Sequence, residues 1–467
     1  MKAMRLFFVI IITCLFGNAG IFAQTSYQLD FVGSMTFPAD PSGCGSADTT
    51  GGTDVWGYTA PDGSEYAIMG VRDGIAVVKV PEMELIDLID GPSSFDCYYH
   101  RDIKTYGHYA FAVAEMYGPQ EGLMILDLQY LPDSVRYVRS YTALGETISH
   151  NLTIDEATGF AYLCSNNDAG VRVVDINDPE NPVDVFKFNV GRAHDVYARN
   201  DTLIISEGSQ GKFSIWDMSV KNIPVRLVRF GPPNAGYAHN AWLTDDGKYL
   251  MTTEETIGKT LKMWDIQDLG NISLLGQYLG ASNIAHNTHI MGNLAFVSHY
   301  KSGVSVVDIS DPNAPAEVAV YDTYPLNDNT GFEGNWGVFP YTQNGYVYAS
   351  DMNGKLTVLK LQITTGIGDQ PEVLPSQIEL AQNFPNPFNP ATQIQIRLPE
   401  MQEISLKIYD LQGRLVTSLS DGIYPAGSHS FIWNGRNNYG ESVASGVYVY
   451  TLQAGNAVFS KKMVLVE

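Results

Sequence analysis

Histidine recurs at one position in five consecutive stretches of this chain. Each of these histidines stands at the entrance to a short segment of strand-like pattern, and they are His100, His150, His194, His239 and His286. A second, largely acidic position recurs at the end of the next apolar segment, with the members Glu115, Glu207, Glu254, His299 and Asp351. Imidazole and carboxylate groups are the ligands that Zn²⁺ and similar divalent ions take in proteins. A fold that gathers both positions would build a site for a polar ligand or for one divalent metal ion.

Three roles are predicted for these side chains. The ligand-binding set is His100, His150, His194, His239, His286 and His289, the last of which follows Asn287 by two residues and shares its face of an extended strand. The metal-binding set is His150, His194, His239, His286, Glu115 and Asp351. If a bound ion activates water, Glu207 or Glu254 would act as the general base. The sequence has no G-x-S-x-G, H-E-x-x-H or phosphate-binding motif, so we expect binding without catalysis, with a metal-dependent hydrolase or lyase as the alternative.

A purely structural role for the histidines is open as well. A residue directly before the inner strand of a repeat often bonds to the backbone of the next repeat, and a His-Asn or His-Asp pair could join neighbouring repeats in this way. Substitution of the histidines would then change stability alone.

The histidines recur because the chain is built of repeats. Seven stretches, among them "HNAWLTDDGKYLMTTE" and "HNTHIMGNLAFVSHY", align on Asp54, Asp102, Asn151, Asp195, Asn240, Asn287 and Asn335, at steps of 44 to 49 residues. Steps of that size are typical of the four-stranded blades of a β-propeller. The first strand of each blade lines the central channel, and second strands end where first strands begin. We therefore expect the imidazoles and the carboxylates to converge on one axial mouth.

The seventh repeat supplies only three strands, and "YQLDFVGSMTF" at residues 27–37 is the predicted source of its fourth. Such a pairing would close the ring and remove its exposed edges. Residues 27–362 are thus predicted to form a seven-bladed propeller. A polar linker at residues 363–378 leads to residues 379–467, where short alternating strands predict a small Ig-like β-sandwich. The fold class is all-β.

Several motifs carry a resemblance to known families. The "DVWGYT", "SDPNAP" and "YDTYPLND" segments resemble the LVIVD-repeat propellers of the choice-of-anchor B family, over roughly residues 40–362. That resemblance implies the fold and export, and no particular chemistry. The "NFPNPFNPAT", "IYDLQGRLV", "SGVYVY" and "SKKMVLVE" blocks resemble the C-terminal sorting domain of the type IX secretion system, an Ig-like module similar to that of flagellar hook-capping proteins. This second resemblance implies the type IX machinery as a partner and a secreted or outer-surface protein of a Bacteroidetes-like Gram-negative bacterium.

The N-terminus predicts export, and the charge balance limits the class of partner. Residues 1–23 have the basic start, apolar run and small residues of a signal peptide, and no later segment predicts a transmembrane helix. Lys and Arg total 28 against 51 Asp and Glu, for a net charge of −23. Because such a surface repels phosphate backbones, we expect no nucleic-acid partner, and an extracellular ligand or protein instead.

Three cysteines remain after removal of the leader. Cys44 and Cys97 precede the first strands of neighbouring repeats, so a disulfide between them is compatible with an oxidising compartment. The alternative is that all three cysteines are free. Cys164, inside "FAYLCS", is predicted to be a core residue.

Overall fold

The computed structural model describes most of the chain between residues 24 and 466. The described ranges are 24–39, 51–93, 100–142, 148–164, 170–281, 284–325, 331–366, 378–383, 386–389, 392–399, 402–424, 427–438, 442–455 and 457–466. Cys44 and Cys97 lie outside them, so the predicted disulfide stays a prediction. Within these ranges every regular element is a β-strand, and none is a helix that could cross a membrane. The contacts divide the chain into two compact units, one spanning Gln24–Thr365 and the other including Gly366–Glu467.

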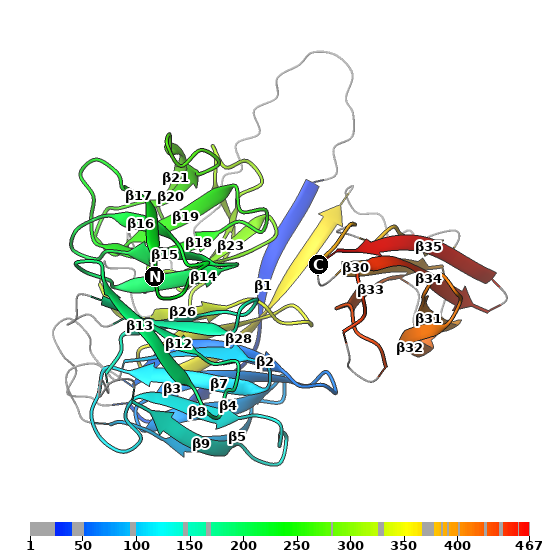
Figure 1. The fold of residues 1–467 in the computed structure, drawn as a ribbon, viewed down its shortest axis with the longest axis horizontal. Helices are drawn as coiled ribbons and strands as arrows, with labels where there is room; N and C mark the ends of the chain where they lie inside the picture. The colour runs from blue at the N-terminus through cyan, green and yellow to red at the C-terminus, as the bar shows by residue number, and fades with distance from the viewer. Residues whose placement is uncertain are drawn as a thin grey trace, which may run out of the picture. The chain divides into compact units, whose positions relative to one another are not determined.

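The first unit is a seven-bladed propeller of four-stranded antiparallel sheets (Figure 1). Blade 1 consists of β2 (Gly52–Thr59), β3 (Glu65–Val71), β4 (Gly74–Val80) and β5 (Glu84–Asp90). Blade 2 consists of β6 (Arg101–Tyr106), β7 (Tyr109–Ala114), β8 (Leu123–Asp127) and β9 (Arg136–Tyr141). Blade 3 consists of β10 (Asn151–Asp155), β11 (Phe160–Cys164), β12 (Gly170–Asp175) and β13 (Val183–Asn189).

The remaining blades follow the same plan. Blade 4 consists of β14 (Asp195–Arg199), β15 (Thr202–Ser206), β16 (Phe213–Asp217) and β17 (Val225–Phe230). Blade 5 consists of β18 (Ala238–Leu243), β19 (Tyr249–Glu254), β20 (Leu261–Asp265) and β21 (Ser273–Tyr278). Blade 6 consists of β22 (Thr288–Met291), β23 (Leu294–Ser298), β24 (Val304–Asp308) and β25 (Ala316–Tyr321). Blade 7 consists of β26 (Asn335–Phe339), β27 (Tyr346–Asp351), β28 (Lys355–Gly366) and β1 (Gln24–Thr36).

Blade 7 joins the two ends of the propeller sequence, as predicted. Its strand order is β1-β28-β27-β26, and Figure 1 shows β1 in blue beside β28 in yellow. β28 runs to Gly366, four residues beyond the expected end of the propeller at residue 362. β1 thus supplies the outer strand of blade 7 and covers the edge that β28 would otherwise expose.

Apolar residues cover both faces of the middle strands of each blade, because neighbouring blades pack on both sides. All seven residues of β3 are buried, for example, whereas the outer strand β5 is largely exposed. One core cluster joins blades 1 and 2 through Ile68, Ile103 and Leu126. Cys164 lies in the cluster between blades 3 and 4, as predicted, and its thiol donates a hydrogen bond to the carbonyl oxygen of His194 at 3.2 Å.

Several of the aligned Asp and Asn residues join their blade to the next. Asp102 Oδ2 accepts a hydrogen bond from the Leu152 amide at 2.7 Å, and Asn151 Oδ1 accepts one from the Val196 amide at 3.1 Å. Asn240 Oδ1 accepts one from the Thr288 amide at 3.1 Å in the same way. These bonds satisfy amides that the inner strands would otherwise bury unpaired. They also fix the first strands around the axis.

The second unit is a β-sandwich, as predicted. One sheet has the order β29-β30-β33, and the other has the order β32-β31-β34-β35. The strands are β29 (Glu379–Leu380), β30 (Thr392–Leu398), β31 (Gln402–Tyr409), β32 (Leu415–Tyr424), β33 (Gly427–Trp433), β34 (Gly446–Ala454) and β35 (Ala457–Leu465). Ile394, Leu406, Trp433, Tyr450 and Met463 form the centre of its core.

Candidate functional site

Five imidazoles and one indole form a closed ring around the propeller axis. The successive ring-centroid distances are 4.1 Å for His100–His150, 4.3 Å for His150–His194, 4.4 Å for His194–His239, 4.2 Å for His239–His286, 4.4 Å for His286–Trp336 and 5.5 Å for Trp336–His100. No histidine of this ring is more than 8% exposed. The structure thus brings the five recurring histidines together at one level of the channel. We call this set the imidazole ring.

The local sequence explains why the ring has five histidines and a tryptophan. In blade 7 the corresponding residue is Gly334, whose φ is +91° and where a Cβ would lie 2.7 Å from the carbonyl oxygen of Tyr300. No side chain fits there, and Trp336 on β26 fills the gap. In blade 1 the corresponding residue is Thr53, whose hydroxyl accepts a hydrogen bond from the Arg101 amide at 3.2 Å.

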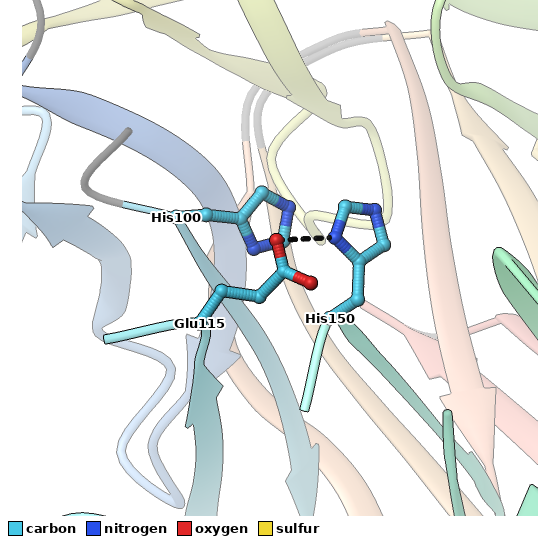
Figure 2. A group of neighbouring side chains, drawn as sticks. All are labelled: His100, Glu115 and His150. Atoms are coloured by element: carbon cyan, nitrogen blue, oxygen red, sulfur yellow. Dashed lines mark ion pairs between the residues drawn. The ribbon is translucent and has the colours of Figure 1, made fainter. Parts of the chain in front are cut away.

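Glu115 lies against the first two imidazoles of the ring, as Figure 2 shows. Its Oε2 is 3.1 Å from His150 Nδ1, and His100, Glu115 and His150 can each place one ligand atom within 4.8 Å of the others. Burial lowers the pKa of His150, but the hydrogen bond and the charge of Glu115 outweigh burial and raise it. Burial and the neighbouring His150 lower the pKa of His100 to about 3. His100 is therefore a neutral imidazole at pH 7, which is the form that binds metals.

A second group of the same composition lies across the ring. His194, His239 and Glu255 also place ligand atoms within 4.8 Å of one another, and Glu255 Oε2 is 3.7 Å from His239 Nε2. The hydroxyl of Tyr300 donates a hydrogen bond to Glu255 Oε1. Burial raises the pKa of Glu255 to about 7. Burial and the other imidazoles hold the pKa values of His194 and His239 well below the usual value.

Four buried nitrogens of the imidazole ring have no hydrogen-bond partner within the described ranges. They are Nδ1 of His100, His194 and His239, and Nε2 of His286. The opposite nitrogen of His286, Nδ1, is 2.6 Å from the carbonyl oxygen of Trp336 in the next blade, and His194 interacts with the backbone of His239. These two contacts are of the kind that the structural interpretation predicts. Moving a nitrogen out of water without a hydrogen-bond partner costs free energy, so contacts between blades do not account for all of the ring.

Other predicted site residues are engaged elsewhere. Arg229 Nη2 lies 2.6 Å from Glu207, and Lys262 forms an ion pair with Glu254. Asp351 accepts a hydrogen bond from Thr323 Oγ1 at 2.7 Å, and burial raises its pKa to about 7. None of these three carboxylates belongs to either metal-competent group found among the described residues.

His289 lies among aromatic side chains outside the imidazole ring. Its ring lies 4.4 Å from Trp242 and 5.7 Å from Trp56, and Tyr341 packs beside it at 5.8 Å. His289 therefore belongs to a layer of aromatic side chains and not to the imidazole ring. His299, the histidine at the end of β23, is buried beside the ring of Tyr278 at 6.4 Å.

Three participants were not foreseen from the sequence. Glu255 follows Glu254 directly, and successive residues of an extended chain point to opposite sides, so the second carboxylate of the pair reaches the imidazoles. The signal for it was the Glu-Glu pair itself. Trp336 directly follows the aligned Asn335, and that spacing predicted a residue that packs between blades rather than a member of the ring. Tyr300 gave no comparable signal.

Comparisons with known proteins agree with this architecture. Residues 283–323 match the model of the LVIVD repeat, and residues 386–457 match that of the FlgD Ig-like domain. No curated protein matches the sequence. Among solved structures, Raptor from Chaetomium thermophilum has a TM-score of 0.54 at 9% identity, with 71% of this chain and 29% of that chain covered.

A second structure, U3-55K, has a TM-score of 0.49 at 11% identity, with 67% of this chain and 95% of that chain covered. This chain spans less than a third of the length of the Raptor chain, and at such identity the likeness to Raptor shows the fold alone. The chain is thus a propeller protein with one segment similar to the LVIVD repeat and another similar to the FlgD Ig-like domain.

Proposed function

We propose that this protein is an exported propeller that binds an extracellular ligand or partner at the imidazole ring, without covalent catalysis. The observation that carries the proposal is the gathering of five buried imidazoles and two carboxylates at one axial position, with imidazole nitrogens that lack a partner among the described residues. Binding sites are built of such convergent polar groups within an otherwise apolar frame.

The export part of the proposal has separate support. Residues 1–23 have a signal-peptide pattern, and residues 379–467 resemble the type IX sorting domain. The match of residues 386–457 to the FlgD Ig-like domain is consistent with that resemblance. The protein would then be released or held at the outer cell surface as a member of the choice-of-anchor B family, with the type IX machinery as its partner during export.

A metal-dependent hydrolase or lyase is less well supported. Such an enzyme needs a carboxylate that is free to take a proton from bound water. Glu207 and Glu254, the predicted bases, each have a cation as partner, Arg229 and Lys262 respectively. These ion pairs favour a structural role for both carboxylates, so binding remains the proposal.

The test is a thermal-unfolding screen of the purified full-length chain. The probes are divalent cations, dicarboxylic acids, amino sugars and short peptides, each added to the wild type and to the Glu255→Gln and Glu254→Gln variants. A ligand present at one hundred times its Kd stabilises the fold by about 2.7 kcal/mol. We expect at least one class to stabilise the wild type and Glu254→Gln but not Glu255→Gln. If no class does so, the proposal fails.

A further inference from the structure

We propose that the imidazole ring carries two separate sites for a divalent first-row transition-metal ion, each made of two imidazoles and one carboxylate. Site A consists of His100, Glu115 and His150, and site B consists of His194, His239 and Glu255. This inference rests on the proposed function, because it names the class of ligand that the ring binds. Zn²⁺ is the ion that suits both sites best.

The distances between ligand atoms fit an ion of this size. Zn²⁺ binds imidazole nitrogen and carboxylate oxygen at 2.0–2.2 Å, so two ligands of one tetrahedral ion lie about 3.4 Å apart. In site A the distance from Glu115 Oε2 to His150 Nδ1 is 3.1 Å, and in site B the distance from Glu255 Oε2 to His239 Nε2 is 3.7 Å. The third ligand of each site lies within 4.8 Å of the other two. Small rotations of the side chains therefore suffice to close both sites around an ion.

Site B contains buried imidazole nitrogens that have no hydrogen-bond partner among the described residues. They are the Nδ1 atoms of His194 and His239. A buried nitrogen without a hydrogen-bond partner can bind a cation through its lone pair. Tyr300 donates its hydroxyl to Glu255 Oε1, and such outer bonds orient a carboxylate ligand.

Charged side chains and imidazoles of the ring line one cavity. Its lining includes Asp54, Asp102, Asp195 and Arg101 together with four imidazoles of the ring. The cavity is large enough for one water molecule. The Lys104 ammonium pairs with Asp54 at 3.3 Å and with Asp102.

The ligand set also determines which ions are excluded. Ca²⁺ and Mg²⁺ take oxygen ligands in larger number, whereas two imidazoles with one carboxylate are a common set for zinc. Three protein ligands leave the fourth position of a tetrahedral Zn²⁺ open to water or to a group of a second molecule. We therefore expect tight binding of Zn²⁺ and no measurable binding of Ca²⁺ at the same concentration.

The experiment measures Zn²⁺ binding to the full-length chain after dialysis against a chelator. Calorimetric titration and elemental analysis should give two equivalents of Zn²⁺ for the wild type. Glu115→Gln should lose one equivalent, Glu255→Gln should lose one, and the double variant should lose both. The matched controls are Glu254→Gln, the direct neighbour of Glu255, and Glu207→Gln, and both should retain two equivalents. Co²⁺ in place of Zn²⁺ gives visible absorption bands that report nitrogen and oxygen ligation in the folded wild type.

The outcomes separate this inference from the proposed function. Absence of Zn²⁺ binding to the wild type, or a stoichiometry that Glu115→Gln and Glu255→Gln leave unchanged, overturns the two metal sites. If the wild type binds a single equivalent of Zn²⁺ and only one of the two variants loses it, the site of the other variant is overturned. If Zn²⁺ fails to bind but another probe of the thermal screen stabilises the chain in a Glu255-dependent way, the metal inference falls and the proposed function stands. If no probe binds, both fall.

Discussion

Asp351 provides a test of how burial controls protonation in this propeller. It is the last residue of β27 and is fully buried. Its Oδ1 accepts a hydrogen bond from Thr323, and its Oδ2 has no partner in the described part of the chain. Burial raises its pKa to about 7, and the charge of Asp322 adds to this, while Thr323 and Lys355 act in the opposite direction.

The pKa shift implies a defined dependence of stability on pH. An unfolded Asp ionises near pH 3.8, whereas the folded carboxyl keeps its proton up to about pH 7. The contribution of this proton to stability is fully present below pH 3.8 and is lost as the pH rises through 7. A shift of about three units corresponds to about 4 kcal/mol, at 1.36 kcal/mol per unit.

Asparagine at this position removes the ionisation but keeps the size of the side chain and an oxygen that can accept from Thr323. We expect Asp351→Asn to have nearly the wild-type free energy of unfolding at pH 4 and to exceed the wild type by up to about 4 kcal/mol at pH 8. Urea unfolding followed by circular dichroism at both pH values measures the difference. Asp322→Asn, the exposed neighbour, is the control and should show a much smaller change. An Asp351→Asn effect that is equal at pH 4 and pH 8 would refute the reasoning.

Two further predictions concern the ends of the chain. Deletion of residues 24–36 removes β1 and exposes the edge of β28, so we expect a lower melting temperature and self-association, measured by circular dichroism and size-exclusion chromatography. An unchanged monomer would show that β1 is dispensable for closure. Deletion of residues 379–467 should leave the propeller inside the cell envelope of a bacterium with a type IX system, as detected by fractionation and immunoblotting. Appearance of that shortened chain in the medium would argue against a sorting role.

The fold could be predicted from the sequence because each blade carries its own local signals. Turn residues, alternating segments and a recurring Asp or Asn define a blade independently of the others, and the spacing then predicts the ring. The convergence of the five histidines followed directly, since residues at one position of a repeat must occupy one level around the axis.

Which residues belong to the site could be predicted less well than the fold, because side-chain directions at the ends of strands depend on the local register. Glu255, rather than Glu254, meets His239, and a shift of a single residue reverses the direction of a side chain. The register of β26 against β27 shifts between Asn335 and Gly337, and such a bulge explains how Trp336 comes to face the axis. Pairing partners such as Lys262 come from other strands of the blade, and their choice depends on packing in three dimensions.

The pairing of β1 with β28 also constrains the order in which this protein folds. β1 is the first strand of the propeller to be synthesised, and β28, its partner, is the last. Contacts between such distant segments form slowly, because a long loop of chain must close before they stabilise anything. Blades 1 to 6 can each form from a continuous stretch, but the ring remains open until residue 366 is available. Over that interval the unpaired strand at the N-terminus is the part of the chain most exposed to misassociation.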